Sequence, residues 1–586
     1  MKMIRRAASV SLAIAFIASG ASYAQSLKDA QVAIDAEQYA KAKTILKNLV
    51  QNKPKDAENY FYLGDVYLVT DYPDSAKTFF QQGLEADPKD NLNKVGLGAV
   101  ALAQGNTAEA EKLFTEATEK TKKKDYLENL YVGRAYMNPN LENPDYKKAL
   151  TYLEKAKEAN QKDALIPSSL GDAYLGAGDN SNAYTNYRDA YDLDNTFTRA
   201  RVQMAIISKQ ARAFAEAIED LTKITQEHPD YAPAFREIAE TYNAKAQLET
   251  KIENYNSDIQ EALKAYKQYM DLTDYSLDSR MRYADFMIKA RDYKNLEEQA
   301  NEMAKVDKVN PRILRYLGYA AYQNGNYPSA QSALTDFFGK VDSTRVIPDD
   351  YYFLGLSKIR QATDSTKALD TTLLAEGVAD VSKGVKKDTT WKLAENLSAE
   401  AKKTFDAKNF SLAGALFKAA AQAPKSKTYN YDLFYWGYAQ YFNYVMAYQA
   451  KQNPSKGILE DAIAAFNKVN EVVPDMAEAY LFKARSERLL DSPDDPKGLG
   501  VETFKKYIEV VEAKGAEAQT ANVKRSLSEA YDVVAADLVN KEDYQGARDL
   551  LNKSLEVNPN DDYAKQTLEQ LKPAANGGAS AQKPQK

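Results

Sequence analysis

A pattern that returns about every 34 residues constrains this 586-residue chain more than any other feature. In residues 57–90, small, aromatic and leucine residues stand at fixed helical offsets, and the same kinds of residue follow one period later. The first copy holds Tyr60, Leu63, Gly64, Tyr67, Ala76, Phe80, Gly83 and Pro88, and the next holds Leu97, Gly98, Ala101, Ala110, Phe114 and Ala117. A fixed period of this length predicts a stack of helix pairs.

Each period contains two helical patterns with a turn between them. Tyr60 and Gly64 are four positions apart, so they share one helix face. Gly64 and Ala76 are small enough for two helix axes to approach closely, and Phe80 fills the wider gap beside them. Pro88 ends the second helix because it cannot donate the next helical hydrogen bond. One hairpin cannot bury its own apolar face, so the pattern predicts that neighbouring hairpins stack and that Gly64 is a packing position.

These residues resemble the tetratricopeptide repeat, most closely in Ala57–Asp90. Further copies carry Leu170, Gly171, Tyr174, Ala183, Tyr187 and Ala190; Ala217, Leu221, Ile224 and Pro229; Leu317, Gly318, Ala330, Leu334 and Phe337; Ala462, Phe466, Val469 and Pro474; and Ala547, Leu551, Ser554 and Pro559. The resemblance covers roughly Leu27 to Leu571. It implies an all-α fold, a right-handed superhelical solenoid of about fourteen helix hairpins.

Departures from the period suggest how the chain is organised. We expect an N-terminal repeat array over residues 25–360 and a C-terminal array with a capping helix over residues 393–572. Residues 361–392 are rich in Thr, Asp and Ser, which predicts an irregular connection or a degenerate repeat. The tail, residues 573–586, lacks apolar residues to bury, so we expect it to be disordered.

The first 24 residues have the pattern of a secretory signal peptide. A basic start is followed by an apolar run, and Ser22 and Ala24 are the small residues that a signal peptidase needs. We therefore expect cleavage after Ala24 and a mature chain that begins at Gln25. The resemblance to exported bacterial repeat proteins implies a periplasmic location, with secretion or attachment to the outer membrane through a partner as the alternative. No later run is apolar enough to span a membrane, so membrane association would come only through partners.

Composition argues against an enzyme and against a nucleic-acid partner. The chain has no cysteine and a single histidine, His228, so it has no thiol nucleophile, no thiolate metal site and no histidine cluster. No phosphate-binding loop or complete dinucleotide fingerprint occurs. We expect no catalytic residue, no cofactor and no metal. Without the signal peptide, 74 basic side chains stand against 83 acidic ones, a net charge of −9, which disfavours nucleic acid.

The one unusual cluster is aromatic. Residues 429–448 include Tyr429, Tyr431, Phe434, Tyr435, Trp436, Tyr438, Tyr441, Phe442, Tyr444 and Tyr448. Trp436 fits a packing position of the repeat and should be structural. By their spacing, Tyr431, Phe434, Tyr438 and Tyr441 share one helix face, where the resemblance places groove residues. We hypothesise that these four bind a partner; the alternative is that a long helix buries them against a neighbouring unit.

Two functions remain open from the sequence. The first is an exported, non-enzymatic scaffold or adaptor that binds a protein or peptide partner in the cell envelope, with an outer-membrane assembly or a secretion complex as its setting. The second is a carbohydrate- or peptidoglycan-binding module that uses surface tyrosines as stacking platforms. The identity of the partner is not written in the sequence.

Overall fold

The computed structural model describes residues 26–119, 125–307, 310–363, 369–492 and 497–572. These residues form helices and turns, with no strand among them, which confirms the predicted all-α fold. The expected signal peptide (1–24) and the expected disordered tail (573–586) lie outside the described residues. The chain divides into two compact units, Met1–Val306 and Asp307–Lys586.

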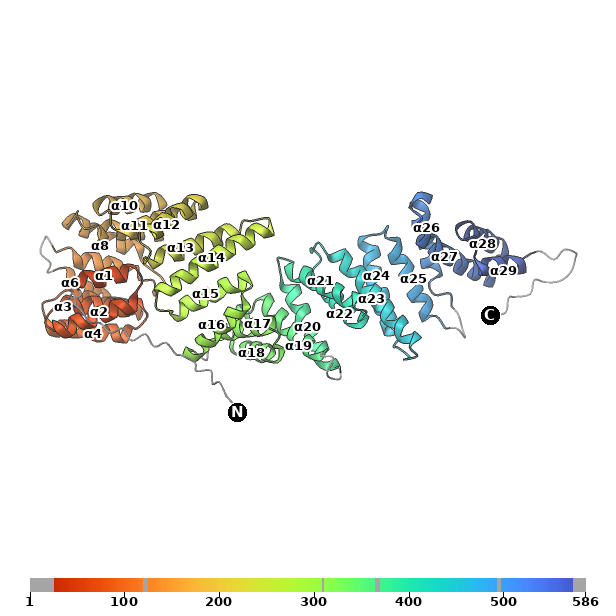
Figure 1. Ribbon diagram of the computed structural model, residues 1–586, viewed down its shortest axis with the longest axis horizontal. Coiled ribbons are helices and arrows are strands. Elements are labelled where there is room, and N and C mark those ends of the chain that lie inside the picture. Colours follow the sequence, from red (N-terminus) through yellow and green to blue (C-terminus); the bar gives the residue numbers. More distant parts are fainter. Residues whose placement is uncertain (1–25, 120–124, 308–309, 364–368, 493–496, 573–586) are drawn as a thin grey trace, which may run out of the picture. The chain divides into compact units, whose positions relative to one another are not determined.

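Unit 1 consists of successive helices that pack as hairpins, as Figure 1 shows. They are α1 (Leu27–Asp35), α2 (Tyr39–Asn52), α3 (Ala57–Val69), α4 (Pro73–Ala86), α5 (Leu92–Ala103), α6 (Thr107–Thr118), α7 (Leu127–Ala135), α8 (Tyr146–Ala159), α9 (Leu165–Gly176), α10 (Asn180–Leu193), α11 (Thr198–Gln210), α12 (Phe214–Glu227), α13 (Ala232–Ala246), α14 (Ile252–Leu272), α15 (Leu277–Ala290) and α16 (Tyr293–Val306). His228 is the residue that ends α12, as its place in the repeat predicts.

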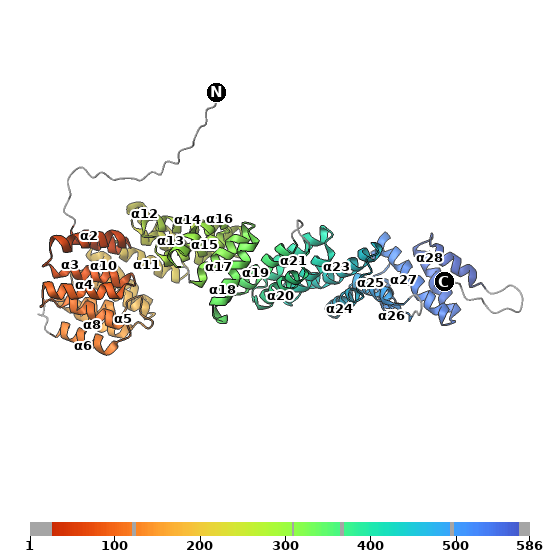
Figure 2. The same cartoon turned by 90° about the horizontal axis from the view of Figure 1, so that it is seen from below.

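Unit 2 continues the same hairpin pattern, and Figure 2 gives a second view of its helices. They are α17 (Pro311–Gln323), α18 (Tyr327–Lys340), α19 (Pro348–Ala362), α20 (Thr371–Lys387), α21 (Lys392–Asp406), α22 (Phe410–Ala420), α23 (Tyr429–Gln449), α24 (Gly457–Val472), α25 (Ala477–Leu490), α26 (Val501–Ala513), α27 (Ala521–Asn540), α28 (Tyr544–Val557) and α29 (Asp562–Gln570), with short 3-10 turns at Ser343–Arg345 and Ala516–Ala518. In the described residues the array ends on α29, which buries Ala564 and Thr567 and leaves Asp562 and Lys565 exposed.

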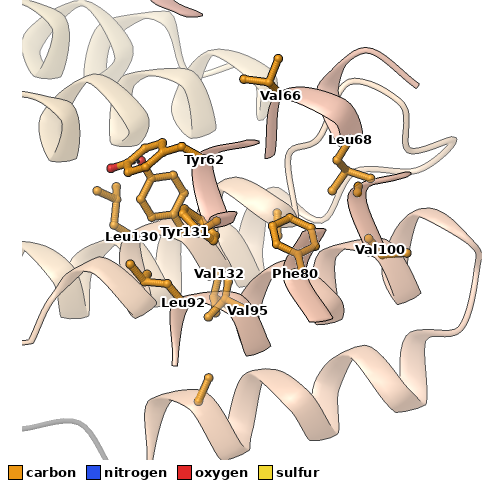
Figure 3. Packing of buried hydrophobic residues seen from close by; sticks show 14 of the residues in the cluster. Tyr62, Val66, Leu68, Phe80, Leu92, Val95, Val100, Leu130, Tyr131 and Val132 are labelled. Atoms are coloured by element: carbon orange, nitrogen blue, oxygen red, sulfur yellow. Dashed lines mark hydrogen bonds between the residues drawn. The ribbon is translucent and has the colours of Figure 1, made fainter. Parts of the chain in front are cut away.

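Glycine lets the helices of each hairpin approach closely, and a large side chain fills the gap beside it. A Cβ atom on Gly64 in α3 would lie 2.5 Å from Cε1 of Phe80 in α4, and one on Gly96 in α5 would lie 2.3 Å from Cδ1 of the same ring. The ring of Phe80 is therefore held between two glycines and is fully buried. Figure 3 shows it among the apolar side chains of this cluster. The predicted packing role of Gly64 is confirmed.

The same pairing recurs along both units. The added Cβ would lie 2.5 Å from the nearest ring atom of Phe114 at Gly98 and of Tyr187 at Gly171, 2.5 Å from Leu334 at Gly318, and 2.8 Å from Phe466 at Gly437. Each contact joins the first helix of a hairpin to the second. A repeated core of this kind becomes continuous only when the hairpins stack.

The hairpin α19–α20 packs differently, and this changes the expected organisation of residues 361–392. A Cβ on Gly355 would lie 2.5 Å from the backbone oxygen of Gly377, so two helix backbones meet directly, with no aromatic ring between them. Because the large partner residue is missing, the repeat pattern is hard to recognise there. The region contains the regular helix α20, and the two compact units meet at residues 306 and 307 instead of at this segment.

In unit 1 the first hairpin also touches a hairpin far along the chain. The turn between α1 and α2 contacts the ends of α13 and α14, at sequence separations of 192 to 234 residues. The side chain of Gln38 donates to the Asp230 carbonyl (3.0 Å), the Ala40 N–H to Asp274 (2.6 Å), the Tyr231 hydroxyl to Asp35 (3.1 Å), the Tyr269 hydroxyl to Glu37 (3.0 Å), and Arg236 forms an ion pair with Glu37. We call this set of contacts the closing contact.

Candidate partner-binding site

The aromatic segment forms α23, a helix of 21 residues whose middle is anchored in the core of unit 2. Trp436 is only 4% exposed, and its indole N–H donates to Asp461 on α24 over 2.8 Å. Gly437 faces the Phe466 ring, as the repeat requires. The structural role predicted for Trp436 is confirmed.

The four residues predicted to bind a partner lie between core and surface. Tyr431 is 38% exposed and packs beside Tyr435, with ring centroids 4.3 Å apart. Phe434 is half-buried and stacks on Tyr438 at 5.3 Å. Tyr441 is also half-buried. The structure therefore keeps both sequence-based alternatives in part: each ring packs against neighbours, and each leaves some of its surface accessible.

Rings from neighbouring hairpins extend this surface. Tyr438 stacks on Phe405 of α21 (5.6 Å) and meets Phe482 of α25 edge-on (4.6 Å). Tyr441 also meets Phe482, at 5.3 Å, and Phe442 at 5.4 Å. All five rings are half-buried. We call this set of five the aromatic face; it joins the first helices of three successive hairpins.

A pocket of about 360 Å³ adjoins the aromatic face between α25, α26 and α27. Phe482 belongs to both, and Leu481, Tyr507 and Val511 give the pocket an apolar wall. Arg485 lies over the Phe482 ring, 5.2 Å from its centroid, and is paired with Glu529 at 3.1 Å. The pocket wall therefore carries an arginine whose charge is already balanced.

The tyrosine hydroxyls of the aromatic face are neutral at physiological pH. Burial raises the pKa of both Tyr438 and Tyr441 above its ordinary value of 10.0. Within the described residues neither hydroxyl makes a hydrogen bond. Each can therefore donate a hydrogen bond to a bound molecule while its ring supplies apolar contact area.

Sequence reasoning found the α23 part of this surface and missed the rest. Phe405 and Phe482 are isolated aromatic residues in their own helices, so no local clustering marks them. The available signal was positional: Phe482 follows Tyr438 and Tyr441 by 44 and 41 residues, which is one lengthened repeat. An alignment of the inner helix of each repeat would have placed the three aromatic positions together.

Two other kinds of site were searched for across the parts of the chain that the structure describes. No three His, Asp or Glu side chains gather there as metal ligands would. Among the same residues, no helix combines the length and apolar character needed to cross a membrane.

The fold and the site define a class: a helical repeat protein whose stacked hairpins present one continuous surface along their first helices. The sequence comparisons identify the family. Residues 33–94 match a tetratricopeptide repeat model, and residues 69–125 match a second one of the same description. The chain is a tetratricopeptide repeat protein. A comparison with curated proteins found no match.

Solved structures of tetratricopeptide repeat proteins are similar to parts of the chain. The C-terminal part of a repeat protein from Cytophaga hutchinsonii is 23% identical and covers 49% of this chain and 99% of its own, with a TM-score of 0.25. PilW, a type IV pilus biogenesis factor, is 16% identical and covers 42% and 92%, with a TM-score of 0.26. YrrB, a repeat protein with an unusual peptide-binding site, is 19% identical and covers 40% and 93%, with a TM-score of 0.19. Likenesses at this level say nothing of what this chain binds.

Proposed function

We propose that this protein is a non-enzymatic scaffold that binds a protein or peptide partner through the aromatic face of unit 2. The observation that carries the proposal is the contact of half-buried rings from α21, α23 and α25, continued by the adjoining pocket. Aromatic side chains near the centre of an interface supply much of its binding energy, because they bury a large area with few rotatable bonds.

The chemistry of this surface favours a partner with an apolar anchor and nearby hydrogen-bond acceptors. The rings and the apolar wall of the pocket offer contact area, and the free hydroxyls of Tyr438 and Tyr441 offer donors. Arg485 is engaged with Glu529, so charge attraction is not the main source of affinity. A peptide segment that inserts an apolar side chain beside Phe482 meets these requirements.

We further propose that the protein is exported and acts in the cell envelope, as part of an outer-membrane assembly or a secretion complex. The support is the pattern of residues 1–24, which lie outside the described residues. Purification of the mature protein from the periplasm followed by N-terminal sequencing tests this part. The sequence should begin at Gln25, and a cytoplasmic protein that retains Met1 would contradict it.

The binding proposal is tested by photo-crosslinking in cells. A benzophenone amino acid at position 441 should capture a discrete set of envelope proteins, whereas one at Tyr184, an exposed tyrosine on α10, should not. Tyr441→Ala and Phe482→Ala should each weaken partner binding while leaving the melting temperature nearly unchanged. By contrast, retention of the purified protein on cell-wall polymer, lost in the same two variants, would favour the carbohydrate-binding alternative.

A further inference from the structure

Unit 1 contains a cavity of about 570 Å³ that is independent of the aromatic face. The first helices of successive hairpins, α3, α5, α7, α9 and α11, supply its wall, and the closing contact joins the first hairpin of the unit to α13 and α14. Phe61, Val95 and Tyr131 belong to the apolar part of the wall. The volume lies within the range of pockets that bind small molecules.

Two acid–base pairs face this cavity, and they behave differently. Asp172 and Arg199 form a direct ion pair at 2.8 Å, and the Tyr187 hydroxyl donates to the same carboxylate at 2.9 Å. Within this pair, both charges and the remaining acceptor of Asp172 are satisfied by the protein itself. It contributes no net charge to the cavity.

The second pair, Asp65 and Arg134, is open. Both line the cavity, yet among the residues that the structure describes neither side chain makes a hydrogen bond or an ion pair. The Arg134 guanidinium rests on the ring of Tyr131, 5.3 Å from its centroid. Burial raises the pKa of Asp65, and the charge of Arg134 opposes that rise. The two groups therefore interact electrostatically without touching.

Charged groups in a partly apolar cavity are normally paired directly, because removal from water is costly. Here the two charges come from different helices and leave space between them. A guanidinium is matched by a carboxylate or a phosphate, and a carboxylate by an ammonium group. A phosphate dianion is disfavoured, because Asp65 and Asp172 face the same space and the open pair has no net charge. A guest with one negative and one positive group restores both partners.

We propose that this cavity binds a small zwitterion, with its carboxylate on Arg134 and its ammonium group on Asp65, and that the guest is a short peptide with free termini. Free amino acids have the same chemistry but fill much less of the cavity. The proposal does not depend on the function assigned to unit 2, since the two sites lie in different units.

Equilibrium dialysis of the full-length protein tests the proposal. The probes are an equimolar mixture of tripeptides of random sequence, the same mixture acetylated and amidated at its ends, and a mixture of free amino acids, each quantified by mass spectrometry. Free tripeptides should be retained, with blocked tripeptides bound about tenfold more weakly or not at all. Equal retention of blocked tripeptides, or no retention of free ones, would overturn the proposal. Preferential retention of free amino acids would keep the zwitterion and reject the peptide.

Variants locate the binding. Asp65→Asn and Arg134→Gln should each weaken tripeptide retention by about tenfold or more, because each removes one charge that the guest needs. Neither side chain holds another residue in place, so the melting temperature should change little. Arg201→Gln is the matched control: Arg201 also lies on α11, but it pairs with Glu227 and does not line the cavity. If Arg201→Gln lowers retention as much as Arg134→Gln does, the assignment to this cavity is wrong.

Discussion

Replacing Gly64 with alanine adds one methyl group at the tightest kind of contact in the fold. The new Cβ would lie 2.5, 2.7 and 2.8 Å from three ring atoms of Phe80. The ring cannot retreat, because Gly96 approaches it from another helix and a Cβ there would lie at 2.3 Å. Relief therefore requires α3 and α4 to separate.

The free energy of unfolding should fall by about 1–2 kcal/mol. Overpacking a filled core costs about 1–3 kcal/mol, and the better helix propensity of alanine returns about 0.5–1 kcal/mol. The melting temperature of unit 1 should drop by about 2–5 °C. Gly64→Leu should lose more, since its side chain is longer by three carbon atoms.

The assay separates the two units by their spectroscopic signals. Both tryptophans, Trp391 and Trp436, belong to unit 2, so tryptophan fluorescence reports on unit 2 and circular dichroism on the whole chain. In Gly64→Ala the circular dichroism transition should begin earlier, and the fluorescence transition should stay in place. Repeat proteins couple mainly through neighbours, so the damage should remain in unit 1.

Two further variants complete this test. Gly339→Ala, on α18, places its methyl group in open space and should gain about 0.5–1 kcal/mol from helix propensity alone. In a Phe80→Leu background, which removes the ring, Gly64→Ala should cost less than in the native protein, giving a favourable coupling energy. If Gly64→Ala stabilises unit 1 as Gly339→Ala stabilises unit 2, the close-packing argument is refuted.

Three more predictions concern other sites. Trp436→Ala should destabilise unit 2 by about 3–5 kcal/mol, measured by urea denaturation, because it empties a buried position and removes the N–H that donates to Asp461; a loss below that of Tyr441→Ala would contradict the core assignment. Burial raises the pKa of Asp432 to about 7 from 3.8, against opposing hydrogen bonds from Ser398 and Thr428, so the stability that it contributes is full below about pH 4 and is lost as pH rises through 7; Asp432→Asn should therefore raise the melting temperature more at pH 8 than at pH 5. Glu37→Gln weakens the closing contact at Arg236 and Tyr269 and should cost about 1–3 kcal/mol by circular dichroism melting, and an unchanged melting temperature would show that the contact adds no stability.

The sequence predicts the repeat fold because its packing rule is local. A small residue at one position and a large one sixteen residues later, as in Gly64 and Phe80, specify a hairpin without information from the rest of the chain. The hairpin α19–α20 escapes this rule because Gly355 packs on the backbone of Gly377, where no large residue leaves a signal. The same limit explains the shifted boundary between the units.

The two sites differ in how far sequence could reach them. The α23 part of the aromatic face is visible as a dense local cluster, but its continuation through Phe405 and Phe482 depends on how hairpins stack. The cavity of unit 1 could not be found, because Asp65 and Arg134 are ordinary charged residues 69 positions apart. Their common environment exists only once five inner helices are assembled.

The closing contact sets an order of events during synthesis. The hydrogen bond from the Ala40 N–H to Asp274 joins residues 234 positions apart, and a ribosome adds about 5–20 residues each second. The first hairpin is therefore made roughly 10–50 s before its distant partner exists. During that interval Asp35 and Glu37 face water, and hairpins can stack only in chain order. A nascent chain stopped before residue 274 would hold stacked repeats around an unclosed first turn.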